Sequence, residues 1–480
     1  MLAIGIVGEA RSPIIYQLYE HDDIVSNAIL SLLGKVCDSK WAIITISIVV
    51  IMTILDSEFI KLFYGTDLDS PGSFHISLFL TFVVITSIIN TACIRFVRNN
   101  DIEARTSRPV VFRIAYSGTT IIQYGILASL ILIIIEILVL QGYEKFFILL
   151  VVYLSHFWSA IMLAVLSFTF VQWFKFTRSF SIVIYAVVFT VILFLILTTV
   201  PLLTEQFSLQ TSLIYSKSYT NLILDTIVPS NNIAFIFGLG NYVLPVMIIS
   251  SWILTVSLLK VYAYRIGRTK FWLLVSIPLL FQLFSFIVRN PDLVTDPDMV
   301  QIIYSKQFQF VLGIGYQVSG LLFAIGFWII GMKMKRKRLR AYLMISAIGI
   351  ASLFSSMQPG MPFYAAYPPF GLVTLMFLGL SSYMLLVGIL GSAAYISNDS
   401  ELRREIFKGL DADSDVLKKM GSAEMQREIE RRVLPLADKV KMSTEIEYTN
   451  LDMNREDLKM LIEDVLNEVH RGTHSKRDNH

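Results

Sequence analysis

Residues 181–203 read SIVIYAVVFTVILFLILTTVPLL and contain no Asp, Glu, Lys or Arg. About 20 consecutive apolar residues are needed for a helix to cross the hydrocarbon core of a bilayer. Within that core, each backbone N–H and C=O must be hydrogen-bonded inside the segment, which a helix achieves. The stretch therefore predicts a transmembrane helix.

Similar apolar stretches recur along most of the chain and set the expected fold class. They cover residues 41–56, 76–94, 115–140, 146–171, 233–259, 271–288, 309–332, 341–357 and 369–396. With residues 181–203 they predict an all-α, polytopic transmembrane helix bundle of about ten spans.

The positions of Lys and Arg predict the orientation of this bundle. With the N-terminus inside, the inside segments hold 35 of the 40 Lys and Arg residues and the outside segments hold five. Cytoplasmic loops are enriched in Lys and Arg, and the predicted spans contain neither. We therefore expect both termini to be cytoplasmic and the protein to lie in the plasma membrane.

Composition divides the chain into three parts. Charged residues make up only 16% of it and the mean hydropathy is +0.64, yet 34 of the 77 charged residues lie in residues 398–480. We expect an N-terminal segment over 1–40, a membrane domain over 41–397 and a charged helical cytoplasmic tail over 398–480. The tail holds 15 basic and 19 acidic residues without a basic cluster, so nucleic-acid binding has no support.

Two ionisable residues lie inside the predicted spans. They are Glu136, near the outer end of the third span, and His156, in the fourth span. Ionisable groups within a membrane are costly and often functional, so the pair is a candidate proton or cation relay. The structural alternative is a glutamate reaching the outer interface and a histidine bonded to a neighbouring helix.

Helix-weakening residues mark the sixth predicted span. Gly238, Gly240, Asn241 and Pro245 lie close together there, and such residues weaken helices and free backbone carbonyls. They are candidates for the unwound backbone that some transporters use to coordinate ions. The ninth span carries small residues from Ala347 to Ser355, which favour close packing within the bundle over a dimer interface.

The tail is expected to hold helices interrupted at Gly421 and Pro435, with a final helix from about Asn454 to His470. An apolar stripe runs along that final helix at i, i+3, i+4, i+7 spacing: Leu458, Leu461, Ile462, Val465, Leu466 and Val469. A helix this short requires a partner for its apolar face. The partner is the tail itself, a second copy of the chain or a cytoplasmic protein.

Four short runs resemble a set of uncharacterised multi-pass membrane proteins of ammonia-oxidising archaea. They are Tyr367-Pro-Pro-Phe-Gly371, Gly379-Leu-Ser-Ser-Tyr383, Leu402-Arg-Arg-Glu-Ile406 and Ser422-Ala-Glu-Met-Gln-Arg-Glu-Ile429. The resemblance covers mainly residues 367–430. It implies an archaeal plasma membrane and carries no activity.

Three functions are open to this sequence. A membrane sensor or scaffold that acts through its tail agrees best with the scarcity of charge in the spans. A secondary transporter would use Glu136, His156 and the sixth span. A glycosyltransferase for lipid-linked sugars would use acids such as Asp67 and Asp69 in the first exterior loop. The sequence has no HExxH, GxSxG or Walker motif, so we favour a non-enzymatic role without cofactor or metal.

Overall fold

The structure is a computed structural model of the chain, and it describes ten separate stretches. They are residues 73–100, 109–208, 213–215, 231–260, 267–289, 306–357, 369, 371–399, 401–404 and 415–445. The first predicted span (41–56), the exterior acids Asp67 and Asp69, and the stripe of residues 458–469 lie outside them.

Helices cover nine of the ten predicted spans. They are α3 (Ser73–Asn100), α5 (Pro109–Leu140), α6 (Lys145–Thr177), α7 (Phe180–Ser208), α8 (Asn231–Leu259), α10 (Arg268–Arg289), α12 (Lys306–Lys333), α13 (Lys337–Ser356) and α14 (Leu372–Asn398). Within the described stretches, six helices are long and apolar enough to cross a membrane: α3, α5, α6, α7, α13 and α14. The all-α character is thus confirmed, and several helices suited to crossing a membrane agree with a multi-pass protein, while the count of ten spans and the orientation stay predictions.

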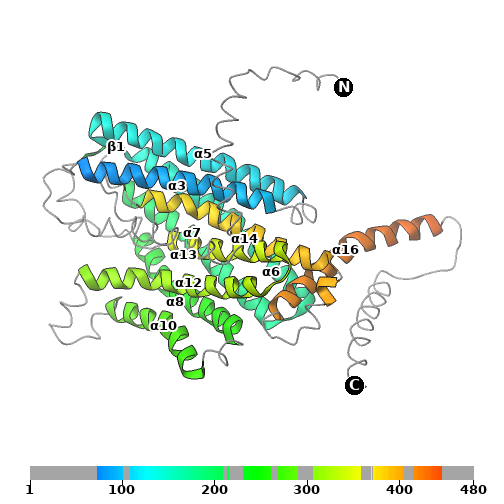
Figure 1. Cartoon of the computed structure of the whole chain (residues 1–480). Helices are drawn as coiled ribbons and strands as arrows, with labels where there is room; N and C mark the ends of the chain where they lie inside the picture. Colours follow the sequence, from blue (N-terminus) through cyan, green and yellow to red (C-terminus); the bar gives the residue numbers. More distant parts are fainter. Residues whose placement is uncertain are drawn as a thin grey trace, which may run out of the picture. The chain divides into compact units, whose positions relative to one another are not determined.

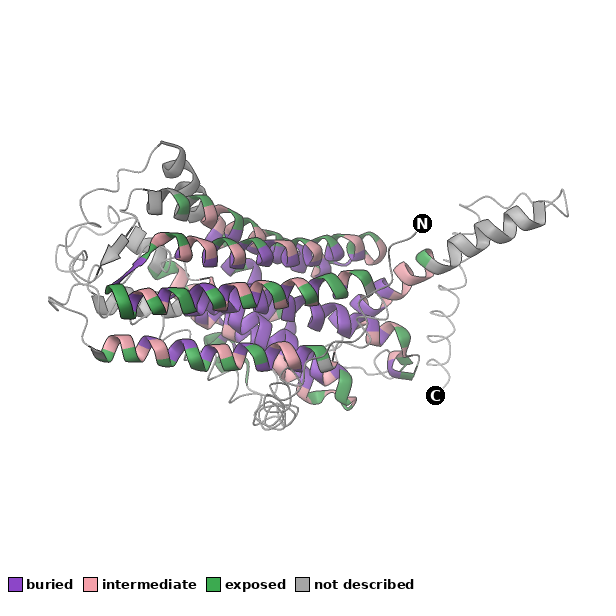
Figure 2. Ribbon diagram, turned by 90° about the horizontal axis from the view of Figure 1, so that it is seen from above, coloured by how far each residue is buried: buried purple, intermediate pink, exposed green. Residues whose placement is uncertain are grey.

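The helix α14 lies at the centre of the bundle and contacts α3, α5, α6 and α13 (Figure 1). Every side chain from Leu372 to Ala394 is buried. By contrast, α5 exposes Ile121, Ile131 and Leu138 on its outer face, and Figure 2 shows exposed residues along the outer helices. Rows of exposed apolar side chains are suited to contact with lipid.

A two-stranded sheet joins the ends of two helix pairs, a detail that the sequence did not predict. Strand β1 (Gly142–Glu144) follows α5, and β2 (Leu213–Tyr215) follows α7. The strands are antiparallel, with Gly142 opposite Tyr215 and Glu144 opposite Leu213. Gln141 adopts a left-handed conformation (φ 51°) that ends α5 and turns the chain into β1.

The predicted break in the sixth span is not found. Helix α8 runs from Asn231 to Leu259 through Gly238, Gly240 and Asn241, with Pro245 inside it. Glycine and proline weaken a helix without necessarily interrupting it, because neighbouring helices in a bundle can restore its hydrogen bonds. The structure therefore shows no unwound backbone at these four residues.

The tail also differs from the expectation. Helix α16 (Asp415–Glu445) continues through both Gly421 and Pro435. A Cβ at position 421 would overlap the side chain of Ile396 at the end of α14, so this glycine permits close packing instead of ending a helix. The chain divides into two compact units after Met425. This boundary comes later than the composition break at Asn398, because Leu402 and the start of α16 belong to the bundle core.

Small residues allow α13 and α14 to approach closely. This agrees with the prediction that the small residues from Ala347 to Ser355 pack inside the bundle. A Cβ at Gly388 of α14 would lie 2.8 Å from the backbone nitrogen of Ser346 and 2.8 Å from the carbonyl oxygen of Tyr342, both on α13. A Cβ at Gly379, also on α14, would meet its nearest atom, Cδ1 of Trp158, at an ordinary 3.5 Å.

We expect Gly388→Ala to lower the stability of the purified protein and Gly379→Ala to leave it nearly unchanged. The first methyl group must push two backbones apart, and overpacking of this kind costs about 1–3 kcal/mol. Both substitutions raise helix propensity equally, so the pair isolates the packing effect. Thermal unfolding in mild detergent measures the difference, and equal midpoints for the two variants would contradict the packing assigned to Gly388.

Candidate functional site

Glu136 is tied to the loop at its own end of the bundle. One of its carboxylate oxygens, Oε2, accepts a hydrogen bond of 2.8 Å from the backbone N–H of Glu144. Glu144 is the last residue of β1 and the N-cap of α6. The half-buried carboxylate therefore connects the end of α5 to the start of α6, which is a structural role.

His156 is buried on α6 and bonds to its own helix. Its Nδ1 lies 2.9 Å from the carbonyl oxygen of Val152 and 3.4 Å from Oγ of Ser155. The hydrogen bonds of Glu136 and His156 are thus made to different partners, and the structure does not join the two residues in a relay. The expectation that His156 bonds to a neighbouring helix is also not met.

A buried layer of polar side chains links α14 to the helices around it. The amide of Gln123 on α5 accepts a hydrogen bond from Asn90 on α3, and donates one of 3.0 Å to the carbonyl oxygen of Met376 on α14. The Ser159 hydroxyl of α6 pairs with that of Ser382 on α14. Hydrogen bonds between membrane helices fix which helices pair and in what register.

A second buried polar contact joins the bundle to α16. The indole N–H of Trp173, near the end of α6, donates a hydrogen bond of 2.8 Å to the Glu424 carboxylate on α16. Trp173 is 0% exposed and Glu424 2% exposed. A buried carboxylate is stabilised only where its hydrogen bonds are satisfied, so this contact specifies how α16 meets α6.

Apolar side chains surround this contact. We use the name α16 dock for Trp173, Glu424 and the buried side chains of α16 up to Ala423. Those side chains are Val416, Leu417, Met420 and Ala423. They belong to the same core cluster as Trp173 and Ile396. The start of α16 is therefore part of the bundle core and not a free linker.

Aromatic rings connect the α16 dock to the interior. Phe170 meets Trp173 edge to face at 5.2 Å between ring centroids, and stacks on Tyr185 of α7 at 5.3 Å. Tyr185 in turn contacts Phe323 and Phe327 on α12. A continuous set of packed rings thus runs from the docked tail helix through α6 and α7 to α12.

Sequence reasoning missed Glu424, although a signal for it exists. Val416, Met420 and Glu424 recur at i, i+4 and i+8, so the carboxylate lies on the apolar face of α16. An acid on an apolar stripe predicts a buried partner, which is Trp173. The partner itself could not be found from sequence, because it lies on another helix far along the chain.

The apolar stripe from Leu458 to Val469 and the exterior acids Asp67 and Asp69 lie outside the described residues. Within the described stretches, no group of three or more His, Cys, Asp or Glu side chains is arranged to hold a metal ion.

Comparison with protein-family models, with curated proteins and with solved structures finds no match to this chain.

We expect Trp173→Phe to loosen the α16 dock. The change removes one hydrogen bond from a buried carboxylate, worth about 1–3 kcal/mol, while keeping an aromatic ring in place. Hydrogen–deuterium exchange of residues 415–425 should become faster by about tenfold or more.

The matched control is Trp158→Phe. It removes a buried indole hydrogen bond of equal length, 2.8 Å, to the Thr119 hydroxyl, but between α6 and α5. Exchange in residues 415–425 should stay as in the wild type. If the two variants affect α16 alike, the hydrogen bond between Trp173 and Glu424 does not hold the dock.

Proposed function

We propose that this protein is a membrane sensor or scaffold, which transmits the state of its helix bundle to a cytoplasmic partner through the C-terminal tail. The observation that carries the proposal is the hydrogen bond between Trp173 and the buried carboxylate of Glu424. Because the start of α16 is packed into the bundle core, a shift of α6 or α14 moves the tail helix with it.

The physical basis of this coupling is the cost of separating the buried groups. Moving Trp173 away from Glu424 would leave a carboxylate buried without this donor, which is unfavourable in an apolar interior. The dock therefore favours two discrete arrangements, α16 packed or α16 released, over gradual displacement. A two-state element of this kind is what a transmembrane signal requires.

The placement of the protein is part of the proposal. The excess of Lys and Arg in alternate loops supports cytoplasmic termini and a plasma membrane, and the archaeal resemblance supports an archaeal host. The partner would bind the apolar stripe of the final tail helix, either as a separate protein or as a second copy of the chain.

A transporter is the second candidate, and one observation favours it. The Gln317 side chain on α12 is buried, and neither its amide oxygen nor its amide nitrogen has a hydrogen-bond partner among the described residues. Two residues farther along α12, the Ser319 hydroxyl lies 3.3 Å from that of Ser251 on α8. Unsatisfied amide groups between membrane helices are suited to a polar solute. Glu136 and His156 give this candidate less support, because each has a structural partner.

Affinity purification in mild detergent tests the proposed function. We expect a stoichiometric protein partner, or a second copy of the chain, to be recovered with the intact protein. It should be lost from a chain ending at Met425 and from the double variant Leu461→Lys with Leu466→Lys, because two charges on the apolar stripe prevent docking. Glu463→Lys, on the polar side of the same predicted helix, is the control and should keep the partner. Recovery of the intact protein alone as a monomer would overturn the proposal.

Reconstitution into liposomes separates the two candidates. A sensor or scaffold should give no proton or solute flux above that of empty liposomes. Flux that falls when Gln317→Leu removes the buried amide, and is unchanged by Trp173→Phe, would instead establish the transporter.

A further inference from the structure

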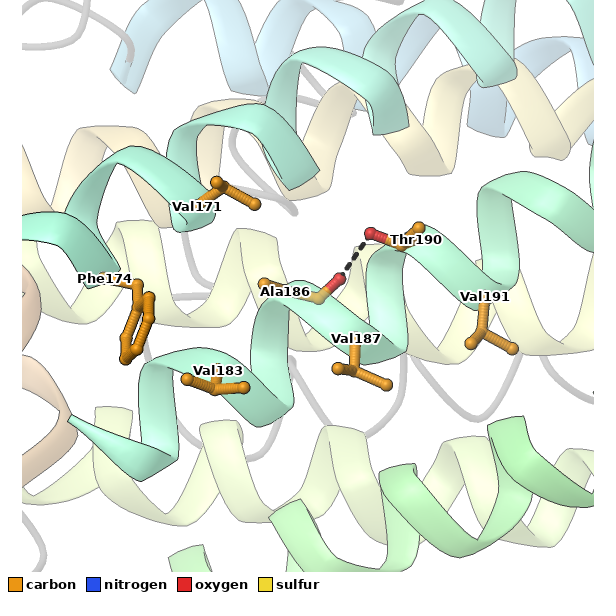
Figure 3. A pocket seen from close by; sticks show the side chains of 7 residues that line it. All are labelled: Val171, Phe174, Val183, Ala186, Val187, Thr190 and Val191. Carbon is orange, nitrogen blue, oxygen red and sulfur yellow. Dashed lines mark hydrogen bonds between the residues drawn. The ribbon is translucent and has the colours of Figure 1, made fainter. Parts of the chain in front are cut away.

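An apolar groove runs along the outer face of the α6–α7 hairpin (Figure 3). It has a volume of about 330 Å³ and is lined by Val171 and Phe174 of α6 and by Val183, Ala186, Val187, Thr190 and Val191 of α7. The Thr190 hydroxyl is the polar group of this lining, and it donates a 2.7 Å hydrogen bond to the carbonyl oxygen of Ala186 on its own helix. The groove therefore offers hydrocarbon surface to whatever fills it.

The groove opens toward the lipid. Phe174 and Val187 on its walls are 39% and 41% exposed, although both helices are apolar enough to span a membrane. From Val183 to Val191, the ends of the lining on α7, the helix rises about 12 Å, which is most of the roughly 15 Å of hydrocarbon in one leaflet. A single hydrocarbon chain entering from one surface would extend along this length.

Positive charge lies at the end of the groove where α6 turns into α7. Arg178 directly follows the last residue of α6, Thr177, and lies four residues after the groove-lining Phe174. Its backbone is left-handed (φ 48°), and its N–H donates a 2.8 Å hydrogen bond to the carbonyl oxygen of Phe174. Arg178 and the neighbouring Lys175 are exposed, and neither has an ion pair with another described residue.

The first turn of α7 adds hydrogen-bond donors at the same place. Helix α7 begins at Phe180, and the N–H groups of Ile182 and Val183 donate to the carbonyl oxygen of Ser179, so the N–H groups of Phe180 and Ser181 are the ones left for a ligand. The preceding Ser179 is 8% exposed, and its hydroxyl has no hydrogen-bond partner among the described residues. Free N–H groups, an unpartnered hydroxyl and two cations are the donors that bind a phosphate group.

We propose that the α6–α7 hairpin binds one anionic phospholipid. The phosphate headgroup is held by Arg178, Lys175, Ser179 and the first N–H groups of α7, and one hydrocarbon chain fills the groove as far as Val191. The charge at the turn selects an anionic headgroup, and the apolar groove selects a lipid over a soluble phosphate. This site is independent of the α16 dock, because it uses the lipid-facing side of the hairpin and not the buried face that carries Trp173.

Native mass spectrometry of the full-length protein, titrated with phosphatidylglycerol or phosphatidylcholine in mild detergent, tests the site. We expect one phosphatidylglycerol to bind more tightly than phosphatidylcholine. The double variant Lys175→Gln with Arg178→Gln should weaken that binding by roughly tenfold or more, because each basic residue near the membrane surface contributes to attraction of an anionic lipid. Arg268→Gln with Lys270→Gln, which removes equal charge at the exposed start of α10, should leave binding unchanged.

A second variant tests the groove without altering charge. Val187→Trp fills it from the exposed wall and should weaken phosphatidylglycerol binding, whereas Leu138→Trp on the lipid-facing side of α5 should not. Equal binding of the two lipids, or phosphatidylglycerol binding that Val187→Trp leaves unchanged, would overturn the proposal. Displacement of the lipid by inorganic phosphate alone, with Val187→Trp behaving as the wild type, would also overturn it, because the site would then be an anion site without a lipid chain.

Discussion

The fold depends on the complete burial of α14. This helix has no charged side chain, and its side chains from Leu372 to Ala394 are all covered by neighbouring helices. In a membrane the hydrophobic effect does not drive apolar helices together, since lipid is as apolar as leucine. Close packing must do so instead, and Gly388 and the small residues of α13 let the two backbones approach. The helices α3, α5 and α6 are then arranged around the remaining faces of α14.

Polar contacts decide which arrangement of apolar helices is adopted. Many pairings of such helices would bury similar hydrocarbon surface, but few satisfy Gln123, Trp158 and Ser382 at once. Gln123 alone bridges α3 and α14 from its place on α5. An unsatisfied polar group in this environment is costly, so these bonds penalise alternative registers. Polar residues that bond between spans therefore serve the specificity of the fold, whereas Glu136 bonds to the adjoining loop and His156 to its own helix.

The buried Trp173–Glu424 contact has a different character, because it lies where membrane helices meet a charged tail. Glu424 is one of several acids in a helix whose composition suits water, yet it is covered by the bundle. Aromatic ring contacts from Trp173 through Phe170 and Tyr185 join the dock to α12. The apolar groove lies on the same hairpin, so α6 and α7 carry both the groove and the Trp173 contact with α16.

The amino-acid sequence by itself determined the class of the protein and the position of its helices. Unbroken apolar stretches such as residues 181–203 have only one stable form in a bilayer, so their location could be predicted from composition alone. Packing could not be predicted in this way, because it depends on residues far apart in the chain. Continuity of α8 through Pro245, the closeness of Gly421 to Ile396 and the pairing of Trp173 with Glu424 became visible only in the tertiary structure. The physical reason is that hydropathy measures the preference of each residue for lipid or water, whereas a buried hydrogen bond or a glycine contact is defined by its partner.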